Sequence, residues 1–320
     1  MKRNSRRTEL ALHAILILIL ALTLLPFAFV INNSMRTNSE MNHSFFGLPR
    51  AAVQAAEITG QKVLGKADTF EVAESQAKGA EVRRAGYWEA IQTIGNQLSD
   101  GYRYAWEVLR PYTLNTILVC LATVLGVLLV GSISAYVFSK CQFAGKKTLF
   151  MAILSFMMIP GVLTLVPSFM WVKQLGLLNS HWVLILPYIA GGQIFAIFLF
   201  KSFFDGLPNE LFESARMDGA GHLRLYWNLV LPLSKPILAV VATTNILGTW
   251  NNFLWPFITN SDEKYHVVSS GLFLMRGTAV SANYATMFAA YVLASIPLLI
   301  LFLYATKPFM TGVTSGAFKA

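Results

Sequence analysis

Residue types that carry out covalent or metal chemistry are few and scattered in this sequence. Two cysteines, Cys120 and Cys141, cannot form a disulfide framework and are predicted to be free thiols. The nearest approach to a phosphate-binding loop, Gly145 to Thr148, has Lys140 where the first glycine belongs and Lys147 where the hydroxyl belongs. No two histidines have the spacing of metal ligands. The five are His13, His43, His181, His222 and His266. We therefore predict no catalytic site, no metal site and no bound cofactor in this chain.

The polar side chains inside the long apolar segments are amides and hydroxyls. The main ones are Asn115, Gln193, Thr243, Thr244, Asn245, Asn251 and Asn252. An unpaired amide is costly in lipid, so these groups are expected to face the interior of a helix bundle or a wet pathway. Two interpretations stay open: hydrogen bonds between helices, or the lining of a path for a neutral polar solute.

The segment Trp250 to Pro256 is the richest of these polar clusters. Aromatic faces beside amides suit sugars, whose ring faces are apolar and whose edges carry hydroxyls. The candidate pathway residues are Asn245, Trp250, Asn251, Asn252 and Trp255. The alternative for the two tryptophans is anchoring at the membrane interface. Pro256 predicts a helix break near the end of this segment.

Composition indicates the elements that hold these residues. Of 320 residues, 55% are hydrophobic and 13% are charged, about half the charged share of a soluble domain. This excludes an ordinary cytosolic enzyme and a disordered chain. A membrane-spanning helix needs roughly 20 apolar residues, and six segments qualify. They are about 10–31, 114–138, 148–172, 182–200, 236–258 and 285–306. The first is predicted to be a retained anchor, since its run of apolar residues exceeds that of a signal peptide.

The charged residues predict the orientation in the membrane. With the N-terminus inside, the inside segments carry thirteen Lys and Arg against five acids, whereas the outside segments are nearly balanced. This is the positive-inside pattern, so both termini are expected in the cytoplasm, and the net charge of +9 needs no nucleic-acid partner. The spans hold no Asp, Glu, Lys or Arg at their centres, which disfavours an ion-coupled carrier.

The cytoplasmic segment 205–235 is predicted to form a compact knob of two short helices. Pro208 suits the start of the first helix, whose apolar face is expected to contain Leu211 and Ala215 with Phe212 alongside. The segment 219–221 contains two glycines and is expected to end that helix. A second helix is predicted to follow and to stop at Pro232. Such a knob suits a groove on a cytoplasmic partner.

This segment resembles the EAA loop of bacterial ABC importer permeases. The matching residues are Glu213, Ser214, Ala215, Asp218 and Gly219, followed by Leu229, Leu231 and Pro232. Ser214 and Leu229 stand where the family has Ala and Ile. Further segments look like carbohydrate-uptake permeases, the second maltose-type subunit most of all. They are 140–147, 158–160, 175–179, 250–256 and 311–320.

The resemblance implies an all-α membrane protein with six transmembrane helices and the type I ABC importer fold. It implies a second permease subunit in a heterodimer, two ATPase subunits that bind ATP and Mg²⁺, and an extracytoplasmic substrate-binding protein in a bacterial inner membrane. Residues expected to couple to the ATPase are Glu213, Ser214, Ala215, Asp218, Gly219, Leu231 and Pro232. A tail expected to contact it includes Thr314, Ser315, Gly316 and Lys319. The alternative is a stand-alone channel for a neutral polar solute.

The expected organisation has four parts. They are an N-terminal part with the first span (1–50), an extracytoplasmic insertion (51–110), a permease core (111–307) and a cytoplasmic tail (308–320). The family pattern does not explain 51–95, in which Phe70 to Lys78 and Tyr87 to Leu98 are predicted to be short helices. This insertion is either a tolerated addition or a contact for an external partner.

Overall fold

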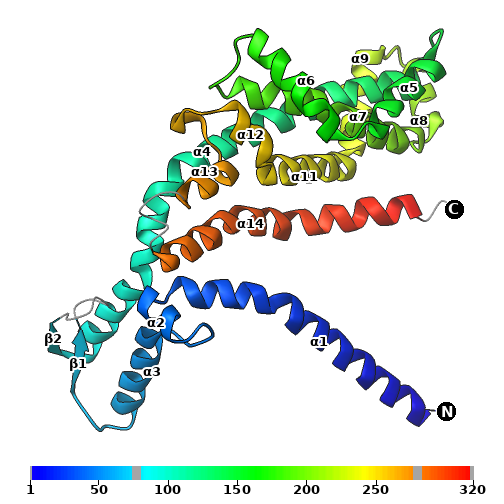
Figure 1. Cartoon of the computed structure of the whole chain (residues 1–320). Coiled ribbons are helices and arrows are strands. Elements are labelled where there is room, and N and C mark those ends of the chain that lie inside the picture. The colour runs from blue at the N-terminus through cyan, green and yellow to red at the C-terminus, as the bar shows by residue number, and fades with distance from the viewer. Residues whose placement is uncertain (1, 74–80, 277–282, 318–320) are drawn as a thin grey trace. The chain divides into compact units, whose positions relative to one another are not determined.

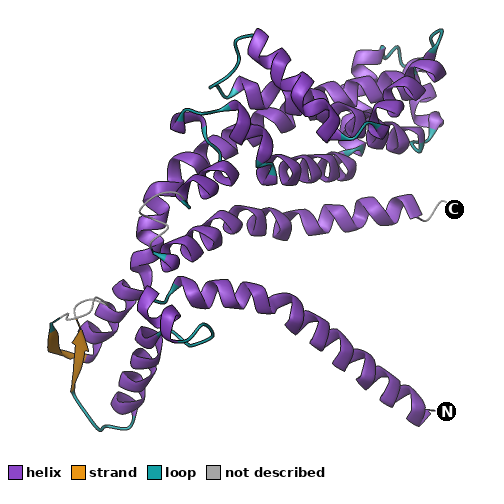
Figure 2. Cartoon of the chain, viewed as in Figure 1, coloured by secondary structure: helices purple, strands orange, loops and turns teal. Residues whose placement is uncertain are grey.

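The structure, a computed structural model, describes residues 2–73, 81–276 and 283–317 and is mainly helical (Figures 1 and 2). The longer helices are α1 (Lys2–Ser34), α3 (Arg50–Val63), α4 (Tyr87–Lys140), α5 (Lys146–Ser155), α6 (Gly161–Gln174), α7 (Trp182–Asp205), α8 (Asn209–Met217), α11 (Lys235–Asn251), α13 (Val268–Met275) and α14 (Tyr284–Ala317). The shorter ones are α2 (Asn38–His43), η1 (Phe156–Met158), α9 (His222–Leu225), η2 (Tyr226–Val230), α10 (Leu231–Leu233), α12 (Leu254–Thr259) and η3 (Glu263–Tyr265).

The chain divides into two compact units, and each is described separately. The first contains Met1–Arg110 and Leu272–Ile296, and the second contains Pro111–Gly271 and Pro297–Ala320. Helices α4, α13 and α14 contribute residues to both units.

Among the described residues, four helices are long and apolar enough to cross a membrane. They include 9–34 of α1, all of α4 and α7, and 284–306 of α14. Two further pairs pass the same test together but are bent, by 99° between 158 and 161 and by 76° between 233 and 235, which makes up to six spans if each pair is one span. A multi-pass helical membrane protein is therefore confirmed, and the count of six spans stays a prediction.

Prolines explain where the predicted spans break. Ile159 precedes Pro160 and is extended (ψ 115°), as the ring of a following proline requires, so the predicted span 148–172 is bent there. The predicted span 236–258 ends its first helix at Asn251, and Asn252 is extended (ψ 111°). The break predicted at Pro256 is thus wrong by about one turn, because Pro256 lies in the first turn of α12, where its missing N–H costs nothing.

The helix that the sequence predicts to stop at Pro232 ends one residue later, at Leu233. A π-helical turn, η2, leads directly into α10, and Pro232 lies in the first turn of α10. The chain changes direction at Ser234, just before α11, which has a second proline, Pro236, in its first turn.

The first unit has a small apolar core of its own. Strands β1 (Thr69–Ala73) and β2 (Val82–Gly86) pair antiparallel and pack with α3 and the start of α4. The helix predicted over Phe70 to Lys78 is wrong in its described part, because Phe70 and Val72 are buried while Glu71 between them is exposed, the period of a strand. Residues 74–80 lie outside the described part of the chain. The helix predicted from Tyr87 is confirmed as the start of α4.

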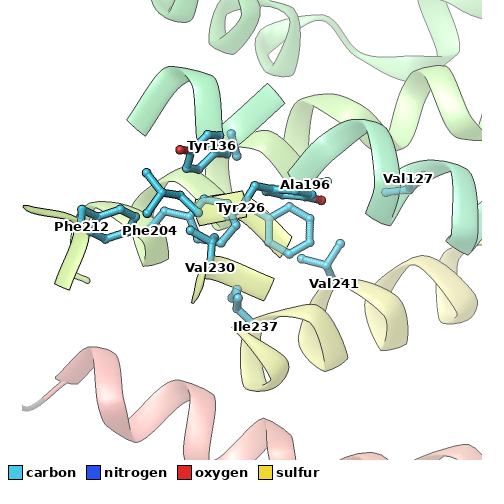
Figure 3. Packing of buried hydrophobic residues seen from close by; sticks show 12 residues of the cluster. Val127, Tyr136, Ala196, Phe204, Phe212, Tyr226, Val230, Ile237 and Val241 are labelled. Carbon is cyan, nitrogen blue, oxygen red and sulfur yellow. The ribbon is translucent and has the colours of Figure 1, made fainter. Parts of the chain in front are cut away.

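The main core of the second unit joins the segment 205–235, which is predicted to be cytoplasmic, to the neighbouring helices (Figure 3). Phe212 of α8 packs in one cluster with Phe204 of α7, Tyr226 and Val230 of η2, and Ile237 of α11. Figure 3 shows these side chains pointing toward one another from four elements. The segment 205–235 is therefore a packed part of this unit.

Candidate functional site

Helix α8 is amphipathic and is fixed by one buried aromatic side chain. Phe212 is 3% exposed, whereas Leu211 is 42% exposed. The apolar face predicted around Leu211 is therefore centred on Phe212 instead, with the partly buried Ala215 beside it. Lys140 supports this placement, since its ammonium lies 4.4 Å from the Phe212 ring centre and donates to the carbonyl oxygen of Leu207 at 3.2 Å. Glu213 and Ser214 lie exposed on the other side of α8.

Gly219 makes the turn that ends α8. Its φ is +77°, in the left-handed region that glycine adopts without strain. Its amide donates to the carbonyl of Arg216 at 2.9 Å, and the next amide, of Ala220, donates to the carbonyl of Ala215 at 2.9 Å. These bonds satisfy two carbonyls at the C-terminal end of α8. Gly219, which the sequence predicts to end the helix, therefore forms a hydrogen-bonded turn there.

The segment after this turn is tied to α4 by two side-chain contacts. The hydroxyl of Tyr226 lies 2.7 Å from that of Ser132, and the hydroxyl of Tyr136 lies 3.0 Å from Nδ1 of His222. The sequence predicts neither of these two contacts, because the residues that form them are 94 and 86 positions apart. The exposed helix α8, the glycine turn and this tether form one structural unit, which we call the cytoplasmic knob (209–233).

A cavity of about 380 Å³ lies between α4, α7 and α11 of the second unit, and we call it the interhelical cavity. It is lined by Val127, Pro187, Tyr188, Gly191, Gly192, Phe195, Val241, Thr244, Asn245, Gly248, Thr249 and Asn252. Small residues keep it open, since a Cβ on Gly192 would come within 2.8 Å of both Asn245 Nδ2 and Val127. Its walls combine apolar surface with hydroxyl and amide groups and contain no charged side chain.

Two of the five predicted pathway residues line this cavity. They are Asn245 and Asn252. Trp255 does not line it, because its indole N–H donates to the carbonyl of Val183 at 2.9 Å inside an apolar cluster. Trp250 is 6% exposed and also lies outside the lining. Asn251 is exposed and donates to the carbonyl of Leu247 in its own helix at 2.9 Å.

The other polar side chains of the spans were expected either to form hydrogen bonds within the helix bundle or to line a path for a polar solute, and both kinds are found. Asn115 donates to the carbonyls of Lys264 and His266 at 2.7 and 2.9 Å, and Thr243 donates to Ala239 of its own helix, so both serve local structure. Other buried side-chain atoms of α4, α7 and α11 find no hydrogen-bond partner among the described residues. They are Thr123 Oγ1, Tyr188 Oη, Asn245 Oδ1 and both amide atoms of Gln193. Thr123 and Tyr188 are absent from the predicted set, since a single hydroxyl within an apolar run carries little signal.

The segment 260–266 of the second unit is a hydrogen-bonded loop. Asn179, with a φ of +54°, accepts from the amides of Ser261 and Asp262 at 2.7 and 3.1 Å. Burial lowers the pKa of His266 below its ordinary value, an effect that Glu263 and Asp262 partly offset. Burial also lowers the pKa of His181, and the nearby charge of Lys264 adds to it. Both imidazoles are therefore held neutral in this loop.

Residues 127–309 match the family described as binding-protein-dependent transport system inner membrane component. The chain belongs to this family. It is accordingly a permease subunit, a transport component and not an enzyme, and it works with a substrate-binding protein and an ATPase. The stand-alone channel is not favoured.

Relatives extend beyond the matched domain. This permease is 28% identical over 319 residues to the diacetylchitobiose uptake system permease protein NgcG of Streptomyces coelicolor. That alignment covers 99% of this chain and 91% of NgcG. It is 37% identical over 206 residues to the galactooligosaccharides transport system permease protein GanQ of Bacillus subtilis, covering 64% of this chain and 72% of that one. The first of these alignments extends over nearly the whole of this chain.

A solved structure shares the fold. One chain of a bacterial ABC transporter involved in the import of the acidic polysaccharide alginate has a TM-score of 0.68 at 19% identity, covering 96% of this chain and 98% of that one. The likeness supports the ABC importer permease fold. Of the predicted tail residues, Lys319 lies outside the described part of the chain, and Thr314, Ser315 and Gly316 belong to the end of α14.

Proposed function

We propose that this permease forms half of the translocation pathway for an oligosaccharide or a related polar solute, with a second, different permease subunit forming the other half. The observation that carries the solute class is the interhelical cavity, which has hydroxyl and amide groups but no charged side chain in its lining. Sugars offer hydroxyl groups for such atoms and apolar ring faces for Val127 and Phe195. The names of the relatives, which refer to diacetylchitobiose and galactooligosaccharides, support the same class.

We further propose that the cytoplasmic knob transmits the motion of the ATPase subunits. Its exposed surface includes Glu213, Ser214 and Asp218, and its base is packed into the core of the spans through Phe212. A rigid knob on a packed base suits coupling between two sites through an element with two positions. Leu231 and Pro232 lie at the end of the knob next to α11, a helix that lines the interhelical cavity.

In this proposal both termini lie in the cytoplasm, as the distribution of Lys and Arg predicts. The tail with Thr314, Ser315, Gly316 and Lys319 then lies on the same side as the ATPase subunits. ATP and Mg²⁺ bind those subunits, and this chain binds no cofactor of its own.

The test is uptake by cells that carry the whole transporter, with radiolabelled diacetylchitobiose, galactotriose and maltotriose as the solutes. Asn245→Ala removes an amide that lines the cavity, and Asn251→Ala is the matched control on the same helix outside it. Loss of one hydrogen bond, about 1 kcal/mol, predicts a roughly fivefold rise in the half-saturating concentration for Asn245→Ala. Asn251→Ala is expected to stay within about twofold of the wild type by the same reasoning.

Three results would each contradict a part of the proposal. ATP-independent uptake would contradict an importer subunit, and equal effects of the two asparagine variants would remove the interhelical cavity from the pathway. Transport of none of the three sugars would reject the solute class.

A further inference from the structure

Two adjoining polar cavities lie in the first unit, where the end of α1, the middle of α4 and the start of α14 meet. Gly101 of α4 marks this junction, because a Cβ there would lie 3.5 Å from the carbonyl oxygen of Ser34 and 3.7 Å from Ala285. The larger cavity has about 340 Å³ and the smaller about 160 Å³. Thr37, Ser39 and Gln97 line both, so the two cavities share one wall. The larger one alone reaches the range of about 300–1,000 Å³ that is usual for small-molecule sites.

The charges around each cavity are balanced. The larger cavity is lined by Arg36 and Asp100, and the smaller by Arg50 and Glu40. An anion in either cavity meets a carboxylate, and a cation meets a guanidinium, so neither is favoured by Coulomb energy. A neutral polar ligand avoids both conflicts and can use both kinds of group.

The shared wall is held in place by a buried arginine. Arg36 is 2% exposed, and its guanidinium donates to the carbonyls of Glu40 at 2.7 Å and Phe45 at 3.0 Å and to Asn33 Oδ1 at 2.8 Å. Thr37 and Glu40 form a capping box at the start of α2. The wall is thus formed before any ligand arrives, which lowers the entropy that binding must overcome.

Acceptor groups on this wall remain available. Among the described residues, the carboxylate of Asp100 makes no ion pair or hydrogen bond, and Gln97 uses its amide N–H₂ to donate to the carbonyl of Ala73 at 2.6 Å, which leaves its Oε1 without a partner. Ser39 is exposed, and its hydroxyl lies 3.0 Å from that of Thr37, which leaves it capacity for a further hydrogen bond. Carboxylate, amide and hydroxyl oxygens on one wall match vicinal hydroxyl groups, which act as donors and acceptors at once.

We propose that these two cavities are a second carbohydrate site of this permease, on its extracytoplasmic side, in which Asp100, Gln97 and Ser39 bind the hydroxyls of a neutral saccharide. This inference rests on the proposed function, since it takes the transported solute to be a carbohydrate. The site is separate from the interhelical cavity and lies at the external ends of α1 and α14. It holds solute near the membrane surface before the solute enters the pathway.

The test is protection of an introduced thiol in cells that carry the whole transporter. Met35→Cys, at a half-buried residue that lines the larger cavity and is not among the proposed binding groups, is made in a Cys141→Ser background. It is labelled with a membrane-impermeant maleimide in the presence and absence of diacetylchitobiose, galactotriose or maltotriose at roughly 20 mM, a concentration suited to weak binding. At least one sugar is expected to slow labelling about threefold or more, as near-saturation of a millimolar site predicts. Adding Asp100→Asn is expected to abolish the protection, and adding Glu107→Gln, an exposed carboxylate on α4 that lines neither cavity, is expected to preserve it.

Three results would overturn this site. They are equal labelling with and without every sugar, protection that survives Asp100→Asn, and equal protection of Ser99→Cys, which lies on α4 outside both linings. Uptake by the wild type, measured in the same cells, separates this inference from the proposed function. Uptake without protection rejects the second site alone, whereas absence of ATP-dependent sugar uptake rejects the function on which it rests.

Discussion

The hydroxyl of Tyr226, in the π-helical turn of the cytoplasmic knob, lies 2.7 Å from the hydroxyl of Ser132 in the C-terminal part of α4. Both side chains are buried, at 4% and 1% exposure. The Ser132 hydroxyl donates to the carbonyls of Leu128 and Leu129 in its own helix. Its oxygen is therefore the acceptor for the hydroxyl of Tyr226. A displacement of the knob therefore acts on α4 through a defined contact as well as through apolar packing.

The first prediction removes this contact. Tyr226→Phe keeps the ring and is expected to cost about 1 kcal/mol of unfolding free energy, the usual value for one buried hydrogen bond. Transport per ATP hydrolysed is expected to fall, because the knob is less firmly joined to α4. The measurement is uptake and ATPase activity of the reconstituted complex.

Ser132→Ala provides the matched control for that prediction. If the two hydroxyls act only through each other, Tyr226→Phe with Ser132→Ala is expected to lose little more than either change alone. Fully additive losses would show that the two hydroxyls act independently.

The second prediction concerns the turn at Gly219. Gly219→Val places a β-branched residue at a φ of +77°, which is expected to cost roughly 1–3 kcal/mol and to displace α8. Gly221→Ala is the matched control, since Gly221 has a φ of −76° and, like Gly219, has open space around a Cβ. We expect Gly219→Val to abolish uptake with normal membrane insertion, and Gly221→Ala to keep most of it. Similar losses of uptake in both variants would show that transport requires free space near the turn, and that the backbone conformation of Gly219 is not the cause.

The third prediction reverses the charge of Glu213. This side chain is exposed on α8, so Glu213→Lys is expected to change unfolding free energy by less than about 0.5 kcal/mol, the range of surface substitutions. Uptake is nevertheless expected to fall at least tenfold, because the charge lies on the surface proposed to meet the ATPase. Co-purification of the ATPase with the tagged permease is the measurement, and Glu210→Lys, one turn earlier on the same helix, is the control. Undiminished uptake and co-purification in Glu213→Lys would remove this residue from the coupling surface.

The sequence predicts most of what depends on local composition. Long apolar segments identify the spans, and Pro208, Gly219 and Gly221 delimit α8 because their backbone preferences are local. The hairpin at Phe70 and Val72 was predicted as helix, because two buried residues in five are too few to distinguish alternation from a helical face. The helix end near Pro256 was misplaced for a related reason, since proline is tolerated in a first turn and only the neighbouring backbone decides where that turn begins.

The candidate site is less accessible to such reasoning because it depends on distant partners. Trp255 and Asn245 have similar surroundings in sequence, but only the packing shows that Trp255 donates to the carbonyl of Val183 while Asn245 lines a cavity. Tyr188 contributes to that cavity from α7, whose position against α11 no local pattern gives. The residue types in the spans predict which chemical groups line the cavity. Which individual residues line it becomes visible only in the folded structure.

The fourth prediction is a loss of stability in acid that depends on His266. The imidazole is 4% exposed, its Nδ1 lies 3.1 Å from the hydroxyl of Ser270, and its ring meets Tyr112 edge to face. Burial lowers its pKa in the folded protein, while the unfolded chain binds a proton near the ordinary value of about 6.5. Below that pH the unfolded state binds more protons, so stability is complete above about 6.5 and decreases as the pH falls through and below that value.

The measurement is the Tm of the purified complex in detergent, by tryptophan fluorescence, at a series of pH values on both sides of the ordinary histidine pKa. The wild type is expected to lose Tm on acidification, and His266→Gln is expected to lose less, because it has no proton to take up. His181→Gln is the companion variant, since the pKa of His181 is lowered by burial and by Lys264 in the same loop, and its effect has the same sign. Because His181 lies only 3.1 Å from Asn115, which also binds the carbonyl of His266, the two changes are expected to be non-additive. An equal fall in Tm for the wild type and both variants would place the acid sensitivity in other groups.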